Sequence, residues 1–131
     1  MSYGHTVTLA TPFADTLAAV REALAGEGFG IVSEVDIAAT LRNKLGVEIE
    51  PQVILGACRP DFAYKALAAE ASIGLLLPCN VVVRSAGATT IVEMIDPAML
   101  VEATGNEDLR AIAGEVGTHL SAAMEALRTG A

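Results

Sequence analysis

The sequence of 131 residues has no tryptophan, and aromatic residues make up only 4% of it. Its hydrophobic fraction of 53% therefore comes mainly from alanine, valine, leucine and isoleucine, which indicates a core of small and branched side chains. The length fits one domain, so we expect a single domain over residues 1–131. Such an apolar surplus on a small chain also favours a subunit interface, and we expect a homodimer.

Positive charge is scarce, because 8 Lys and Arg residues stand against 16 Asp and Glu residues, for a net charge of −8. An acidic surface repels phosphate backbones, so we expect no nucleic acid partner. Long apolar runs are also missing. The longest, residues 71–83, is broken by Pro78 and Asn80, whereas a spanning helix needs about 20 apolar residues. No basic segment followed by an apolar run opens the chain. We therefore expect no membrane association and a cytoplasmic location.

Cysteine and histidine occur only twice each. The two cysteines do not form a Cys-x-x-Cys pair, and in a reducing compartment we expect free thiols rather than a disulfide. A tetrahedral metal site needs four ligands, and the chain has four candidates: Cys58, Cys79, His5 and His119. No spacing among them resembles a zinc motif, so the sequence predicts neither a metal site nor a cofactor.

Hydrophobic periodicity predicts an α+β fold. Short runs rich in β-branched residues alternate with stretches whose apolar residues recur at helical spacing. The predicted strands cover residues 4–9, 29–35, 52–57, 75–85 and 89–95; the predicted helices begin after Thr11, after Asp36, at Pro60 and after Asn106. Helices near both ends with a hairpin between them favour a mostly antiparallel sheet covered by helices.

Three details of this pattern can be checked in a structure. A two-residue loop at Ala86-Gly87 would set Cys79 opposite Met94 and Asn80 opposite Glu93. On the third helix the expected buried face carries Ala63, Ala66 and Leu67. On the last helix the apolar stripe is expected to be Leu109, Ile112, Val116, Leu120, Met124 and Leu127.

The first cysteine lies in the segment Gly56-Ala57-Cys58-Arg59-Pro60. If Pro60 opens a helix, Cys58 lies just before a helix N-terminus, whose free N–H groups favour an anion. Arg59 adds positive charge, and both features favour the thiolate form of Cys58. The alternative is that Cys58 is a small hydrophobic residue ending a core strand.

The second cysteine lies within a run of aliphatic residues, Leu77-Pro78-Cys79-Asn80-Val81. Strand alternation places Cys79 on an apolar face that points into the core or an interface. Asn80 lies on the opposite face, where it either holds a small polar ligand or fixes a neighbouring loop by hydrogen bonds. Cys58, Arg59, Cys79 and Asn80 are the candidate ligand-binding residues.

Four segments resemble the domain-of-unknown-function 302 family: residues 28–36, residues 54–60, residues 73–83 and Asp96-Pro97. The resemblance covers nearly the whole chain, and the block Leu76-Leu77-Pro78-Cys79-Asn80-Val81 is its most specific part. It implies a two-layer sandwich with a curved, mainly antiparallel sheet, often met as a dimer, and it implies no established activity. Arg59 replaces the asparagine that usually follows the first cysteine, and Ala71 replaces a usual proline.

Three hypotheses for function follow. The first is a small domain that binds or senses a small ligand at a pocket containing both cysteines. The second is a thiol redox or persulfide enzyme with Cys58 as nucleophile and Cys79 as its partner. The third is a structural or assembly module in which both cysteines are buried and inert. The sequence does not decide whether the protein is an enzyme.

Overall fold

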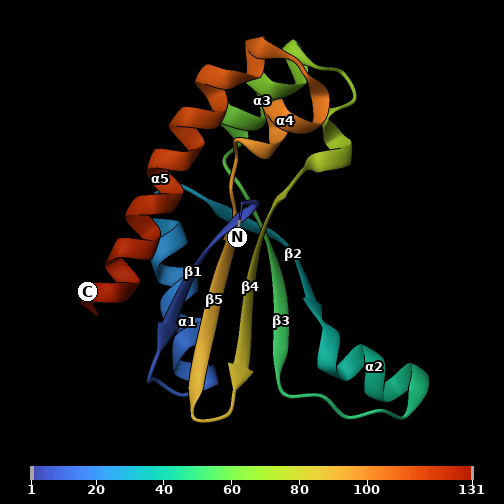
Figure 1. Cartoon of the computed structure of the whole chain (residues 1–131), viewed down its shortest axis with the longest axis vertical. Coiled ribbons are helices and arrows are strands. Elements are labelled where there is room, and N and C mark those ends of the chain that lie inside the picture. Colours follow the sequence, from blue (N-terminus) through green and yellow to red (C-terminus); the bar gives the residue numbers. More distant parts are fainter. Residues whose placement is uncertain (1, 131) are drawn as a thin grey trace.

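Five strands and five helices make up the fold in this computed structural model, which describes residues 2–130 (Figure 1). The strands are β1 (Gly4–Leu9), β2 (Gly30–Asp36), β3 (Gln52–Cys58), β4 (Cys79–Ala86) and β5 (Thr89–Ile95). The helices are α1 (Phe13–Gly26), α2 (Ile37–Leu45), α3 (Pro60–Ala69), α4 (Met99–Thr104) and α5 (Arg110–Thr129). Two short 3-10 turns, η1 (Ile73–Leu76) and η2 (Glu107–Leu109), precede β4 and α5.

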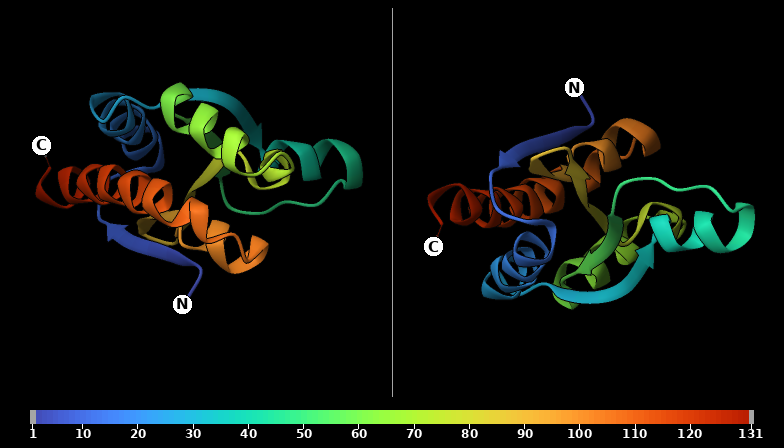
Figure 2. Two further views of the ribbon diagram at one scale, coloured as in Figure 1. Left: turned by 90° about the horizontal axis from the view of Figure 1, so that it is seen from above. Right: turned by 90° about the horizontal axis from the view of Figure 1, so that it is seen from below.

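The strands form one sheet in the order β1-β5-β4-β3-β2, and every neighbouring pair is antiparallel. Alternation along the central strands produces one fully buried face, carried in β4 by Val81 and Val83. Helices α1 and α5 cover this face and pack on each other, so the sheet and these helices form two layers (Figure 2). The predicted α+β class with an antiparallel sheet is confirmed.

The apolar stripe of the last helix is largely as predicted. Its residues are buried from Leu109, at the end of η2, to Leu127 in α5, except that Ile112 is only partly so. Asp36 caps α2 by accepting a hydrogen bond from the Ala39 N–H at 2.9 Å, and Gly46 ends that helix in the left-handed conformation. Thr11 does not cap α1. Pro12 holds the cap position, and Thr11 Oγ1 lies 2.6 Å from Thr16 Oγ1.

The segment before the second cysteine differs from the prediction. Residues 75–78 are not part of a strand: Leu75 belongs to η1 and is 88% exposed, and the Leu77-Pro78 peptide bond is cis. Strand β4 begins only at Cys79. Proline carries no N–H to donate to a neighbouring strand, so the apolar run could not extend the ladder through Pro78.

The hairpin between β4 and β5 is shifted by two residues in register from the prediction. Val81 pairs with Met94 and Val82 with Glu93, so the predicted pairing of Cys79 with Met94 and Asn80 with Glu93 is wrong. The loop is Gly87-Ala88, because Gly87 takes the positive φ of 62° that the first position of a tight hairpin turn requires.

The predicted buried face of the third helix is only partly correct. In α3 Ala66 is buried as predicted and Ala63 is half-buried, but Leu67 is 47% exposed and Phe62 is buried in addition. Helix α4 was not predicted at all. Its residues Leu100 and Val101 join Ala66, Ile73 and Leu109 in a small second core at one end of the sheet. This second core, above the ends of β3 and β4 in Figure 1, forms part of the surroundings of the cysteines.

The sheet face opposite α1 and α5 carries mixed side chains, among them Asn80, Val82 and Arg84 from β4. Helix α2 extends from the end of β2, away from the two-layer core (Figure 1). Ala38 is the single buried residue of that helix. Among the described residues, no helix combines the length and apolar character needed to span a bilayer.

Candidate functional site

The first cysteine segment folds as the sequence suggested. Strand β3 ends at Cys58, Arg59 occupies the cap position, and Pro60 is the first residue of α3. Ala57 continues the buried face of β3, and it lies directly opposite Cys79 on β4. Because these two strands pair at this point, the chain brings the two cysteine segments side by side.

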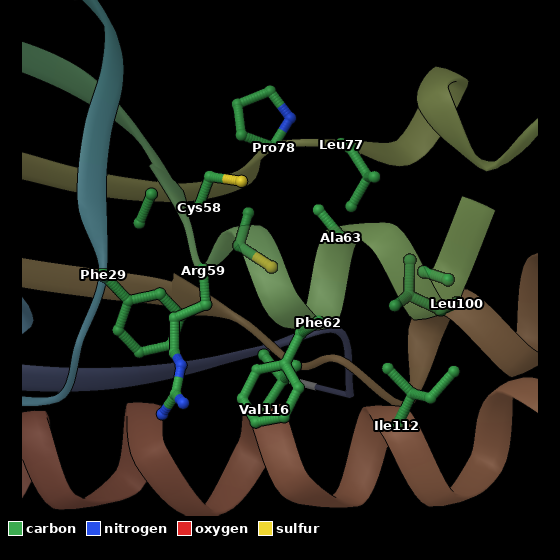
Figure 3. A pocket seen from close by; sticks show the side chains of 13 residues that line it. Phe29, Cys58, Arg59, Phe62, Ala63, Leu77, Pro78, Leu100, Ile112 and Val116 are labelled. Atoms are coloured by element: carbon green, nitrogen blue, oxygen red, sulfur yellow. The ribbon is translucent and has the colours of Figure 1, made fainter. Parts of the chain in front are cut away.

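Cys58, Arg59 and Cys79 line one cavity of about 30 Å³ between the end of β3, helix α3 and helix α5 (Figure 3). This volume suffices for about two water molecules, so the unliganded cavity is small. Its other walls are aromatic or aliphatic: Phe29, Ala57, Phe62, Ala63, Ala66, Leu77, Pro78, Leu100, Ile112 and Val116. A lining of this kind suits an apolar group rather than a charged one.

A second apolar hollow, of about 150 Å³, lies next to this cavity. Cys79 and Leu100 line both spaces, so these two side chains stand between them. The remaining walls of the hollow are Leu76, Ile95, Asp96, Pro97, Met99 and Ala103. Helix α4 supplies Met99, Leu100 and Ala103 to the walls of this hollow.

Asn80 does not line this cavity. It is exposed, and it lines a different hollow on the opposite face of the sheet together with Tyr3, Gly4, Val82, Glu93, Met94 and Ile95. Strand alternation separates it from Cys79, as the sequence indicated. The structure therefore brings together three of the four candidate residues and leaves the fourth outside.

The guanidinium of Arg59 is bound to the protein itself. It donates hydrogen bonds to Asp61 Oδ2 at 3.0 Å and to the Glu27 carbonyl at 3.2 Å, and its Cζ lies 4.4 Å from the Phe62 ring centroid. The hydrogen bond from Arg59 lowers the pKa of Asp61. In Figure 3 the Arg59 side chain is directed away from the Cys58 sulfur. Arg59 therefore acts as a wall of the cavity, and its charge is compensated by Asp61.

The two thiols have different environments. Cys58 is half-buried, whereas Cys79 is buried, and both are free cysteines. Burial raises the pKa of Cys79 from its ordinary 9.0 to about 11, and the nearby Cys58 adds to the rise. At neutral pH Cys79 is thus a protonated thiol, and Cys58 is the more exposed of the two cysteines.

One interaction beside the cavity was not predicted. His119 Nδ1 lies 2.8 Å from Glu27 Oε1, and its ring is tilted against Phe62 with centroids 5.8 Å apart. The His119 side chain is only 35% exposed. The signal was present in the sequence, because His119 follows Val116 by three residues at the edge of the buried stripe of α5.

The four side chains considered as zinc ligands do not gather in the structure. His119 pairs with Glu27, and His5 Nε2 lies 3.3 Å from Asp96 Oδ2. Within residues 2–130, no three side chains of the types His, Cys, Asp and Glu are grouped so that they could hold a metal ion.

Comparison with known proteins finds one matching family and a similar crystal structure. The family model described as "Domain of unknown function DUF302" matches residues 5–127. The crystal structure of an uncharacterized conserved DUF302 protein from Bacillus stearothermophilus superposes with a TM-score of 0.88 at 31% sequence identity, over 95% of this chain and 98% of that one. No curated protein matches the chain. Because the family model covers residues 5–127 and the similar structure covers nearly the whole chain, the chain belongs to the DUF302 family, a family of unknown function.

Proposed function

We propose that this chain is a small-ligand-binding or sensing domain whose ligand enters the cavity walled by Cys58, Arg59 and Cys79. The observation that carries the proposal is that two segments twenty-one residues apart line one cavity, with one half-buried and one buried cysteine. The aromatic and aliphatic walls favour a ligand that is mainly apolar. The adjoining hollow of about 150 Å³ supports a ligand that extends past Cys79 and under α4.

Native mass spectrometry of the chain purified from its own host tests this proposal. We expect one small molecule per chain, and we expect it to be lost from an Ala63→Phe variant, because Ala63 lines the cavity and a phenyl ring would fill it. Ala68→Phe is the matched control, because Ala68 lies on the exposed face of the same helix. A ligand that persists in Ala63→Phe, or no bound molecule in any of the three proteins, would contradict the proposal.

The thiol redox hypothesis has weaker support. Both sulfurs line the same cavity, as that hypothesis needs. However, the attacking species in thiol–disulfide exchange is the thiolate, and the pKa of Cys79 is raised to about 11. A buried thiol that keeps its proton at neutral pH is a slow partner for Cys58, so we favour ligand binding.

We also propose that two copies of the chain associate through β2 and α2. Strand β2 is an edge of the sheet, and edge strands present unpaired backbone groups to another chain. Apolar side chains are exposed along this region, namely Val32, Val35, Leu45, Val47 and Ile49. A nine-residue helix with one buried residue gains little stability from its own chain, which favours a second copy as its cover.

Sedimentation velocity tests this association. We expect the wild-type chain to sediment as a dimer and Leu45→Glu to shift the population to monomer, since Leu45 is 70% exposed on α2. Leu75→Glu is the control, because Leu75 is 88% exposed on η1, outside the proposed interface. A monomeric wild-type chain would contradict the proposal, as would a dimer that Leu45→Glu leaves intact.

A further inference from the structure

A cleft of about 420 Å³ lies beside α5, separate from the cysteine cavity. Strands β1 and β5 supply one wall and α5 the other, and none of the lining residues belongs to the cavity of Cys58 and Cys79. Its walls are His5, Met94, Asp96, Pro97, Gly114, Gly117, Thr118, Leu120, Ser121 and Met124. At Gly114 and Gly117 an added Cβ would meet nothing within 4 Å, so this stretch of α5 leaves the cleft open.

Two thioether side chains and one imidazole side chain line the cleft. The sequence has four methionines and two histidines, and two of these methionines and one histidine line this cleft. His5 and Met94 are direct cross-strand partners, a position in which Cβ atoms lie about 4.5–5.5 Å apart. Met124 reaches the cleft from the buried face of α5. These sulfur and imidazole groups distinguish the cleft chemically from the rest of the protein, whose core is mainly aliphatic.

Asp96 lies beside the imidazole of His5. Its Oδ1 accepts a hydrogen bond from the Ala98 N–H at 2.9 Å, which fixes the carboxylate. Its Oδ2 lies 3.3 Å from His5 Nε2. A carboxylate beside one ring nitrogen orients the histidine and leaves the other nitrogen, Nδ1, to bind a ligand. Asp96 thus stands where it can position the imidazole, and the side chains with soft donor atoms that line the cleft are His5, Met94 and Met124.

We propose that this cleft binds a monovalent soft metal ion, Cu(I) in the cell, through His5 Nδ1 and the sulfurs of Met94 and Met124. Thioether sulfur selects Cu(I), and imidazole suits copper, whereas Mg²⁺ and Ca²⁺ prefer oxygen ligands. The ion stays in the +1 state on binding, so no electron is transferred. The proposal does not depend on a ligand in the cysteine cavity.

Silver(I), the redox-stable substitute for Cu(I), tests the proposal by NMR. The chain is labelled with 13C in its methionine methyl groups and carries Cys58→Ser and Cys79→Val, which remove the competing thiols. We expect the methyl signals of Met94 and Met124 to shift and to saturate at one silver ion per chain. Met99 is the internal control, because it lies on α4 outside the cleft. Shifts that do not saturate, or that affect Met99 equally, would overturn the proposal.

Substitutions in the same background test each group. His5→Ala, Met94→Leu and Met124→Leu should each raise the silver dissociation constant at least about tenfold, and leucine keeps the volume of methionine. Asp96→Asn should raise it about 10–100-fold. His119→Ala should leave the constant unchanged, because His119 pairs with Glu27 elsewhere.

Two measurements distinguish a positioning role of Asp96 from a purely structural one. In Asp96→Asn we expect weaker silver binding at an unchanged urea midpoint, together with a changed 15N shift at His5 Nε2. If Asp96→Asn, His5→Ala and Met94→Leu all bind silver as tightly as the parent protein, the assignment of these residues is wrong.

Discussion

Raising the pH from 9 to 11 will lower the free energy of unfolding of the wild-type chain by about 2 kcal/mol more than that of Cys79→Val. The Cys79 thiol is buried, and its pKa in the folded chain is raised from 9.0 to about 11. In the unfolded chain the same thiol ionises near its ordinary pKa. Between these two values the unfolded state binds fewer protons than the folded state, so stability falls as pH rises.

The measurement is the urea-induced unfolding transition at several pH values across this range, analysed by linear extrapolation. Other groups of the chain also titrate at alkaline pH, and their contribution cancels in the difference between wild type and Cys79→Val. Cys58→Ser is the matched control: it removes the half-buried thiol and should retain most of the alkaline loss. If wild type and Cys79→Val lose stability in parallel, Cys79 is not the buried thiol described here.

Replacing Gly56 with alanine should destabilise the chain by about 1–3 kcal/mol. A Cβ at this position would approach Pro78 Cγ to 2.5 Å and would also collide with the Ser33 hydroxyl. Gly56 lies in the middle strand of three, opposite Ser33 on β2 and Asn80 on β4. The proline ring is stiff, so the collision must displace Pro78, which also lines the cysteine cavity. Urea unfolding of Gly56→Ala gives the change in stability.

Gly114→Ala is the control for Gly56→Ala. Gly114 lies inside α5, and an added Cβ there meets nothing within 4 Å. Alanine is favoured over glycine in a helix interior by about 0.5–1 kcal/mol, so this variant should be more stable than wild type. Equal effects of the two substitutions would show that the close approach of Pro78 to Gly56 is incorrect.

Periodicity predicted most of the fold because the buried faces of its long elements are continuous. The stripe from Leu109 to Leu127 repeats over several helical turns, and the alternation through Val81 and Val83 repeats along a strand. Each pattern is long enough to identify its element as a helix or a strand. The wrong predictions concern element boundaries that depend on a single residue. Pro78 ends the apolar run before β4, and Gly87 selects the hairpin loop. Propensity alone does not locate such points to within two residues.

The site was predictable only in part. Sequence placed Cys58 next to the start of α3, because Pro60 marks a first helical residue. That Cys79 lies against the same cavity depends on the pairing of β3 with β4, a long-range contact that the local pattern does not contain. The same holds for the hydrogen bond from Arg59 to the Glu27 carbonyl, and for the contact of His119 with Glu27.

Cys58 and Cys79 line one cavity, and Cys58 is the more exposed of the two. Alkylation of the native chain with iodoacetamide at neutral pH, followed by mass mapping of each cysteine, tests it most directly. We predict modification of Cys58 in the folded protein and protection of Cys79 until urea unfolds the chain, because Cys79 is 8% exposed and keeps its proton. Protection of both cysteines, or faster modification of Cys79, would contradict the account.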